Sequence, residues 1–369
     1  MYTQSVSTSE RNTTVVTFRQ RMKGWFNNLL VTLVGLIVGF IISEIALAFL
    51  KPPPVRWLYP QTHYLPDKEL GWVMKANQHS YTHDHPMDTN SLGLRSPEIN
   101  SAKQPGALRV ICLGDSQTFG NGVAQEQTFA ARLESLLRSR MPGRAIDVIN
   151  AGIAGYDTVQ EVKLLERIAP SLKPDIVVVG FYLNDIVEVL QPKNRYVIDA
   201  ESGEFQRTGL LKQFTPYRLI YLLKRSRVVT FLYWNYLVRR WNAEVNIQKA
   251  VLLGKTAPQL EPAWPVIEKT LLHAETLGKE LGFKVIVFPV PAGSEFFGDH
   301  PHEQYRSRLI SVAEKLGLGH FDPTPQMKAA GGEFDKYFIQ WDGHINPATH
   351  NLIAELLAPK VTALLKPVS

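Results

Sequence analysis

The stretch that decides the fold is Val110-Ile111-Cys112-Leu113-Gly114-Asp115-Ser116, an apolar run that stops at a Gly-Asp-Ser turn. A short apolar run bounded by glycine predicts a buried strand of a parallel sheet. In open α/β sheets, ligands gather just beyond the carboxyl ends of such strands. Ser116 is therefore a candidate nucleophile, provided that a base and donors for an oxyanion come from elsewhere in the chain.

Three later blocks supply residues of those types. They are Val148-Ile149-Asn150-Ala151-Gly152, Ile176-Val177-Val178-Val179-Gly180-Phe181-Tyr182-Leu183-Asn184-Asp185 and Trp341-Asp342-Gly343-His344-Ile345-Asn346-Pro347. The first two predict further apolar strands that end in polar residues, and the third precedes an apolar helix. Each block alone is typical of ordinary turn chemistry. Together, and in this order, they favour one catalytic site.

With these four blocks the chain resembles the SGNH/GDSL hydrolases, serine esterases and acyl-transfer enzymes named after Ser, Gly, Asn and His in separated blocks. The resemblance runs from about Tyr64 to the C-terminus. The stretches Glu69-Leu70-Gly71-Trp72 and Asn90-Ser91-Leu92-Gly93-Leu94-Arg95 resemble a membrane-anchored bacterial branch of the family. The resemblance implies a three-layer α/β/α domain with a doubly wound, mainly parallel, flavodoxin-like sheet. The residues that it singles out are Ser116, Gly152, Asn184 and His344.

The chemistry explains why these residue types are needed. A serine hydroxyl is a poor nucleophile until a base removes its proton, and His344 is the expected base. Asp342, two residues earlier, is expected to fix the imidazole tautomer and to stabilise the imidazolium. The expected oxyanion donors are the backbone N–H groups of Ser116 and Gly152 and the side-chain amide of Asn184. Glycine at position 152 would let the backbone approach the substrate closely.

Two other assignments of the acid remain open. Many family members space the acid and the base as Asp-x-x-His, whereas here the spacing is Asp342-Gly343-His344. Gly343 can adopt backbone angles closed to other residues, so the shorter spacing is compatible with the chemistry. Asp335 is an alternative acid, and a Ser–His dyad without a carboxylate is the other arrangement. His350 falls within the following helical pattern and ranks below His344 as the base.

Composition fits one packed catalytic domain and argues against several other kinds of site. Of the 369 residues, 45% are hydrophobic and 20% are charged, which is ordinary for a globular chain. The net charge of +6 is spread along the chain, without zinc-finger spacing or an RNA-binding signature, so we expect no nucleic-acid partner. The single cysteine, Cys112, excludes an intrachain disulfide and is expected to be a buried apolar side chain. No metal-ligand spacing or phosphate-binding fingerprint occurs, so no cofactor is expected.

The N-terminal region predicts a membrane anchor. Residues 1–28 form a basic tail, and residues 29–50 carry Glu44 as their only charged side chain. A helix of that length spans about 33 Å, which matches a hydrocarbon core of about 30 Å. Positive charge before the span predicts a single pass through the inner (cytoplasmic) membrane, with the N-terminus inside and the catalytic domain in the periplasm. A cleaved signal peptide is the alternative, because Ala46-Leu47-Ala48 offers a small-x-small site.

The rest of the chain divides into a connector at 51–107, expected to pack on the domain as short strands and loops, and a catalytic domain at 108–369. Repeated strand–glycine–helix signals in this domain predict parallel β-α units. We expect strands at 109–113, 146–150, 176–181 and 284–290, and helices at 128–138, 158–168, 264–281, 303–316 and 347–357.

An insertion at about 186–262 follows the third of these strands. We expect a hairpin from residues 196–199 and 204–208. Residues 217–241 are dense in aromatic and leucine side chains, with arginine and lysine interleaved. They predict either a helical cap over the site or a basic amphipathic segment on anionic lipid.

Three functions are compatible with these observations. The first is a membrane-anchored, extracytoplasmic serine esterase that hydrolyses O-acyl esters. The resemblance and the topology suggest an O-acetyl group on a cell-surface or exported polysaccharide as its substrate. The second is an O-acyltransferase that uses the same Ser-His-Asp site, with a sugar hydroxyl in place of water. The third is a glycan-binding or assembly protein on a fold that no longer catalyses a reaction.

Overall fold

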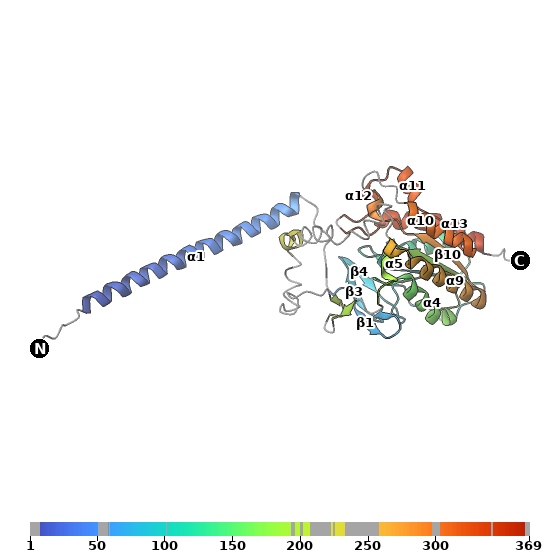
Figure 1. Ribbon diagram of the computed structural model, residues 1–369, viewed down its shortest axis with the longest axis horizontal. Helices are drawn as coiled ribbons and strands as arrows, with labels where there is room; N and C mark the ends of the chain where they lie inside the picture. Colours follow the sequence, from blue (N-terminus) through green and yellow to red (C-terminus); the bar gives the residue numbers. More distant parts are fainter. Residues whose placement is uncertain are drawn as a thin grey trace.

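The computed structural model describes residues 8–50, 58, 60–100, 102–192, 196–199, 202–206, 223, 226–232, 258–296, 303–340 and 342–365. Figure 1 shows a long N-terminal helix followed by an α/β domain. Most of the segment expected to form a cap or a lipid-contacting helix, 217–241, lies outside the described residues, as does Trp341 of the fourth block.

Five parallel strands form the centre of the domain: β5 (Leu108–Gly114), β6 (Ile146–Gly152), β7 (Ile176–Phe181), β10 (Lys284–Pro289) and β11 (Gly319–His320). Their order across the sheet is β11-β10-β7-β5-β6, and every pairing is parallel. Numbered by appearance, this is the flavodoxin-like order 2-1-3-4-5. The winding reverses between β5 and β7, so ligands are expected at the carboxyl ends of these two strands. The predicted doubly wound parallel sheet is confirmed.

Helices cover both faces of the sheet, which gives the three predicted layers. One face packs against α3 (Phe129–Arg140) and α13 (Pro347–Leu364). The other packs against α4 (Thr158–Leu172), α9 (Ala263–Leu281) and α10 (Glu303–Leu316). Every residue of β5 is buried, as expected for a central strand that serves two apolar layers.

The predicted elements occur close to their expected bounds, and two helices run further than expected. α4 continues from residue 168 to Leu172 and contains Pro170, and α13 continues through Pro359 to Leu364. Proline removes one backbone hydrogen bond from a helix. In α4 the buried side chains of Ala169 and Leu172 keep the last turn packed against the core, which outweighs that loss.

The helix predicted at 128–138 begins at a cap: the hydroxyl of Thr128 accepts a hydrogen bond from the backbone N–H of Ala131 at the start of α3. The predicted hairpin is also confirmed. The insertion begins with an antiparallel hairpin of β8 (Val197–Ile198) and β9 (Phe205–Gln206). The remaining short elements of the domain are α2 (Ser116–Phe119), α5 (Asp185–Glu188), α11 (Thr324–Ala329), α12 (Phe334–Tyr337) and the 3-10 turns at Gln125–Gln127, Pro258–Leu260 and Gly293–Phe296.

The expected connector is part of the domain's core. It forms two hairpins, β1 (Tyr64–Asp67) with β2 (Gly71–Met74) and β3 (His79–Thr82) with β4 (His85–Asp88). Trp72 in β2 is fully buried, and its indole N–H donates to the carbonyl of Ala154, 3.1 Å away. This interaction fastens the first hairpin to the loop that follows β6, at the carboxyl edge of the sheet.

The N-terminal helix, α1 (Thr8–Leu50), is 43 residues long. Its segment Met22–Phe49 is long and apolar enough to cross a membrane, and it begins seven residues before the predicted span at 29–50. A signal sequence would pass the same test of length and composition. Near the end of α1, the carboxylate of Glu44 accepts hydrogen bonds from the backbone N–H groups of Arg227 and Val228 in the insertion.

Candidate active site

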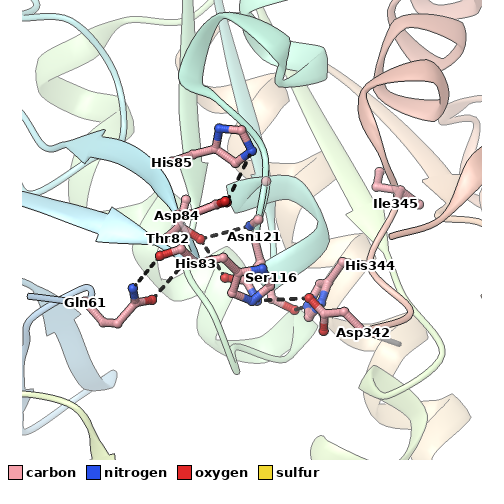
Figure 2. A network of polar contacts seen from close by, with 12 residues as sticks. Gln61, Thr82, His83, Asp84, His85, Ser116, Asn121, Asp342, His344 and Ile345 are labelled. Atoms are coloured by element: carbon pink, nitrogen blue, oxygen red, sulfur yellow. Dashed lines mark hydrogen bonds and ion pairs between the residues drawn. The ribbon is translucent and has the colours of Figure 1, made fainter. Parts of the chain in front are cut away.

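The structure brings Ser116, His344 and Asp342 together in one chain of hydrogen bonds (Figure 2). Oγ of Ser116 lies 2.9 Å from Nε2 of His344, and Nδ1 of His344 lies 2.8 Å from Oδ1 of Asp342. Of the two candidate acids, Asp342 is therefore the one that contacts the histidine, whereas Asp335 lies exposed on α12. The arrangement is that of a triad and differs from a Ser–His dyad.

Ser116 owes its position to the abrupt turn at the end of β5. Asp115 precedes α2 and caps it, because its Oδ1 accepts a hydrogen bond of 2.8 Å from the backbone N–H of Gln117. Ser116 is the first residue of α2, where a backbone N–H has no partner within the helix. Its hydroxyl and its backbone N–H thus both lie at the carboxyl edge of the central strand.

The short acid–base spacing works because Gly343 adopts a left-handed conformation, with φ of 84°. This conformation is accessible to glycine and strained for other residues, and it lets the side chains at 342 and 344 meet. The loop is held at both ends. Oε1 of Gln117 accepts from the backbone N–H of Ile345 at 3.0 Å, and the carbonyl of His344 accepts from the N–H of Ile339 at 2.8 Å. The expectation for Gly343 is confirmed.

Electrostatics in the buried triad favour a basic histidine. Burial alone would lower the pKa of His344, but the carboxylate of Asp342 outweighs it and leaves this pKa raised above 6.5. Burial alone would raise the pKa of Asp342, but the neighbouring His344 and His83 hold it below its usual value of 3.8. Asp342 is therefore ionised and His344 is ready to accept a proton near neutral pH.

The three expected oxyanion donors differ in the hydrogen bonds that they already make within the protein. Gly152 ends β6, and its N–H donates to Oδ1 of Asn150 at 3.0 Å. One hydrogen of the Asn184 amide donates to Oε2 of Glu188 at 3.1 Å, and the Asn184 side chain also interacts with the carboxylate of Asp115. A substrate oxyanion would therefore compete with Asn150 for the N–H of Gly152, while Glu188 orients the amide of Asn184.

The structure gives a reason for glycine at 152 that differs from the one predicted. A Cβ atom there would lie 2.3 Å from the backbone nitrogen of Phe119 and 2.7 Å from the carbonyl carbon of Thr118. Glycine thus allows the backbone of α2 to pass directly over the end of β6. The absence of a side chain at position 152 therefore lets α2, which begins with Ser116, pack against the end of β6.

His83, which sequence reasoning missed, lies on the outer side of the triad. Its Nε2 atom is 3.2 Å from Oδ2 of Asp342, and its side chain is almost completely buried. Gln61 brackets its backbone, donating to the carbonyl of His83 at 2.8 Å and accepting from its N–H at 3.1 Å (Figure 2). This bracket holds the residue at φ of 54°, a conformation unusual outside glycine.

The loop after α2 packs against the imidazole of His83. A Cβ atom on Gly122 would lie 2.3 Å from Nδ1 of His83, so the imidazole fits only against glycine. Thr82 donates to Oδ1 of Asn121 at 2.7 Å and accepts from the N–H of Gly122 at 3.0 Å. The β3–β4 hairpin and the nucleophile's loop are thereby joined around the histidine.

Arg95, a second residue that sequence reasoning missed, holds the C-terminal end of α2. Its buried guanidinium donates to the carbonyls of Phe119, Gly120 and Val123, at 2.9, 2.6 and 2.7 Å. These are carbonyls at and just after the end of α2; those of Phe119 and Gly120 also accept from the Asn150 amide and from the N–H of Val123. Arg95 ends one of the two upstream stretches that carried the family resemblance, and that was the only sequence signal for it.

Two other titratable groups lie in the core without joining the triad. Cys112 is buried in β5, where burial raises the pKa of its thiol. His350 is buried in α13 and accepts a hydrogen bond from the N–H of Phe129 at 3.1 Å, and burial lowers its pKa to about 3. Among the described residues, no cluster of His, Cys, Asp and Glu could hold a metal ion.

A buried carboxyl group, Glu161 on α4, stands apart from these. The nearby Asp185 accepts from the backbone N–H groups of Tyr182 and Thr158 at 2.8 Å each. In the part of the chain that the structure describes, neither carboxylate oxygen of Glu161 has a hydrogen-bond partner. Burial, together with the carboxylates of Asp185 and Asp115, raises the pKa of Glu161 well above 4.5, so this residue holds a proton.

Comparisons with known proteins found several similar solved structures. Similar solved structures include TesA (16% identity, 70% of this chain and 99% of that chain, TM-score 0.41) and a lipase/acylhydrolase from Enterococcus faecalis (18%, 71% and 99%, TM-score 0.40). Another is a single-residue variant of Axe2, an acetyl xylan esterase from Geobacillus stearothermophilus (16%, 69% and 95%, TM-score 0.41). No curated protein matches the chain.

A family model matches over more than half of the sequence. It is the model of the GDSL-like lipase/acylhydrolase family, and the match covers residues 112–352, from the central strand to the helix after His344. The matched segment contains Ser116, Gly152, Asn184 and His344. The chain belongs to the GDSL-like lipase/acylhydrolase family, serine hydrolases that act on esters.

Proposed function

We propose that this protein is a membrane-anchored, extracytoplasmic serine esterase that hydrolyses O-acyl esters, with Ser116, His344 and Asp342 as its catalytic triad. The observation that carries the proposal is the continuous hydrogen-bonded chain from Oγ of Ser116 through His344 to Asp342. It lies at the point of the sheet where the winding reverses, and it is built from residues far apart in the sequence.

In the first half of the reaction, Oγ of Ser116 attacks the ester carbonyl carbon while its proton passes to Nε2 of His344. Asp342, ionised and 2.8 Å from Nδ1, stabilises the imidazolium that forms. The N–H groups of Ser116 and Gly152 and the amide of Asn184 stabilise the oxyanion. The bond from the carbonyl carbon to the alcohol oxygen then breaks, and the alcohol leaves with the proton from Nε2.

In the second half, water attacks the acyl group on Ser116 and gives a proton to Nε2 of His344. The acid leaves, and the proton returns to Oγ of Ser116. Each half uses the same base and the same donors, so loss of any one member of the triad should affect both. An acceptor hydroxyl in place of water would turn the same steps into acyl transfer.

The proposed location rests on α1 and on the charge before it. The 28 residues of Met22–Phe49 form a helix of about 42 Å, enough to cross a bilayer core of about 30 Å. Lys and Arg residues precede this segment in the sequence, which favours an inside N-terminus and an outside catalytic domain. For a domain placed there, an O-acetyl group on a cell-surface or exported polysaccharide is the substrate that we propose.

The test uses the full-length chain in detergent, as the wild type and as Ser116→Ala. Both are treated with a fluorophosphonate. An activated serine attacks its phosphorus atom and displaces fluoride. A single adduct on Ser116, together with acetyl-ester turnover that Ser116→Ala lacks, would support the proposal. Ser139→Ala, on the exposed side of α3, is the matched control and should keep both properties.

Each contrary result has a distinct meaning. No adduct and no turnover in the folded wild type would overturn the esterase and favour a binding or assembly protein. An adduct on Ser116 with acyl transfer to an added sugar, faster than hydrolysis, would instead make the protein an O-acyltransferase.

A further inference from the structure

The chain that leaves the anchor helix enters directly into the wall of the active site. Leu58 is the first described residue after α1, and its backbone N–H donates to the carbonyl of His83 at 2.8 Å. Gln61, three residues later, binds both backbone groups of the same histidine. His83 in turn contacts Asp342 of the triad. The tether is therefore attached at the catalytic edge of the sheet.

The length of this tether limits how far the site can lie from the membrane. Only seven residues separate Leu50, the end of α1, from Leu58. A fully extended chain spans at most about 3.3–3.6 Å per residue, so these ends lie within about 29 Å of each other. The wall of the site thus stays within about 29 Å of the end of the anchor.

A second connection between the anchor and the catalytic side comes from the insertion. Glu44 of α1 accepts hydrogen bonds from the N–H of Arg227 at 3.0 Å, from the N–H of Val228 at 3.1 Å and from the hydroxyl of Ser226. Residues 227–232 are helical, drawn in yellow beside the end of α1 in Figure 1. This insertion begins directly after Asn184, an expected oxyanion donor. The end of α1 is therefore connected both to the tether, which reaches His83, and to the insertion, which follows Asn184 in the sequence.

The orientation of the domain agrees with these contacts. In Figure 1, β3, β4, α5 and α12 lie on the side of the domain from which α1 extends, and the C-terminus lies at the opposite end. These elements flank His83, Asn184 and His344 in the sequence. Leu58 in the tether and Leu232 in the helical segment beside the end of α1 have exposed side chains. Exposed apolar side chains close to an anchor suit contact with a lipid surface.

From these observations we propose that the catalytic side faces the bilayer that holds α1, and that the acylated polysaccharide of the proposed function is hydrolysed while a lipid holds it in that bilayer. The inference rests on the proposed esterase function and on α1 remaining as an anchor. A short tether at the catalytic edge raises the local concentration of a bilayer-held ester at Ser116. It gives no such advantage to an ester that is free in solution.

The experiment changes the tether and compares two esters. The full-length chain is reconstituted in phosphatidylcholine vesicles, with and without a flexible Gly/Ser spacer of about 24 residues inserted after Pro54, long enough to behave as a random coil. One substrate is umbelliferyl acetate in solution, and the other is the same acetyl ester coupled to a phospholipid headgroup in the vesicle. The same spacer added after Ser369 is the matched control, since it lengthens the chain and leaves the tether unchanged.

The expected result is selective. Lengthening the tether about fourfold should lower turnover of the lipid-coupled ester about eightfold, because effective concentration falls as the −3/2 power of linker length. Turnover of the soluble ester should stay the same, which also shows that the spacer variant is folded. Glu44→Gln, which removes the charge at the second connection, should lower the lipid-coupled rate in the same direction.

Equal effects on the two esters, or no effect on either, would overturn this inference while leaving the esterase intact. If neither ester is turned over and Ser116 is not labelled by the fluorophosphonate, the proposed function fails and this inference fails with it. The soluble ester thus separates the two failures.

Discussion

Nε2 of His83 lies 3.2 Å from Oδ2 of Asp342, while His344 contacts the other oxygen of the same carboxylate. The carboxylate is thus placed between two imidazoles. Burial lowers the pKa of His83 to about 4, so this second imidazole is neutral near pH 7. A neutral ring packed at this distance can hold Asp342 in position without adding a positive charge that would oppose the imidazolium of His344.

Replacing His83 tests this positioning role. His83→Ala should lower kcat about 10- to 100-fold, the order expected when a polar neighbour of a buried charged group is removed. KM should change little, because His83 acts through Asp342. The measurement is steady-state turnover of an acetyl ester by the full-length chain. His83→Gln keeps a polar side chain and should recover part of the rate; equal losses in both variants, with KM raised, would point to a purely structural role.

The pH dependence of catalysis should report the raised pKa of His344. Only the neutral imidazole can accept the serine proton, so kcat/KM should fall as the pH drops through a value above 6.5. In Asp342→Asn the charge that raises this pKa is gone and burial remains, so the acidic limb should move below 6.5. The rate at its plateau should also fall, on the order of 10⁴-fold, as expected when the acid of a Ser-His-Asp triad is lost. If the acidic limb of the pH profile does not move in Asp342→Asn, a group other than His344 is responsible for it.

Removing the side-chain amide at 184 should affect the transition state more than substrate binding. Asn184→Ala should reduce kcat about 10²- to 10³-fold, the usual effect of losing one oxyanion donor. Glu188→Gln retains an oxygen that can accept from the amide, so it should stay within a fewfold of the wild type. Comparable losses in the two variants would indicate that Asn184 serves mainly to hold α5.

The protonated carboxyl of Glu161 should make stability depend on pH. Its pKa is raised in the folded state, so the folded protein keeps a proton that the unfolded chain releases above about pH 4.5. Stability therefore falls as the pH rises through that range. Glu161→Gln removes the titration and should raise the melting temperature at pH 8, by roughly 2–4 °C for each kcal/mol relieved.

At pH 4 the same substitution should leave the melting temperature nearly unchanged, since Glu161 is then neutral in both states. Glu280→Gln, at an exposed position on α9, is the control and should show no comparable difference between the two pH values. Thermal unfolding of both variants at pH 4 and pH 8 makes the comparison. A destabilised Glu161→Gln at pH 8 would mean that the carboxylate is charged and paired in the fold.

The parts of the site that the sequence predicts are those encoded locally. The apolar run before Ser116, the strand that ends in Gly152 and the Asp342-Gly343-His344 turn each carry their structure in a few neighbouring residues. The left-handed angle at Gly343 could be expected because glycine is the residue that adopts it readily.

The parts that the sequence does not predict depend on packing between distant segments. His83 becomes a neighbour of the triad only when the β3–β4 hairpin lies on the loop after α2 and Gln61 fixes its unusual backbone angle. A strand of four residues has too short a pattern to reveal such a contact. The true reason for Gly152, the passage of Phe119 above it, is likewise visible only once β6 and α2 are placed together.

The burial of the segment before β5 determines where the protein can be truncated at its N-terminal side. The matched family segment begins at residue 112, which invites a cut just upstream of the central strand. Such a cut would strip away Trp72, whose ring is wholly covered, together with Arg95 and His83. The product would expose the core residues that Trp72 covers, lose the three hydrogen bonds from Arg95 to carbonyls at the end of α2, and lose the imidazole next to Asp342. We expect it to precipitate or to lack activity, whereas a fragment that begins ahead of Leu58 keeps these parts.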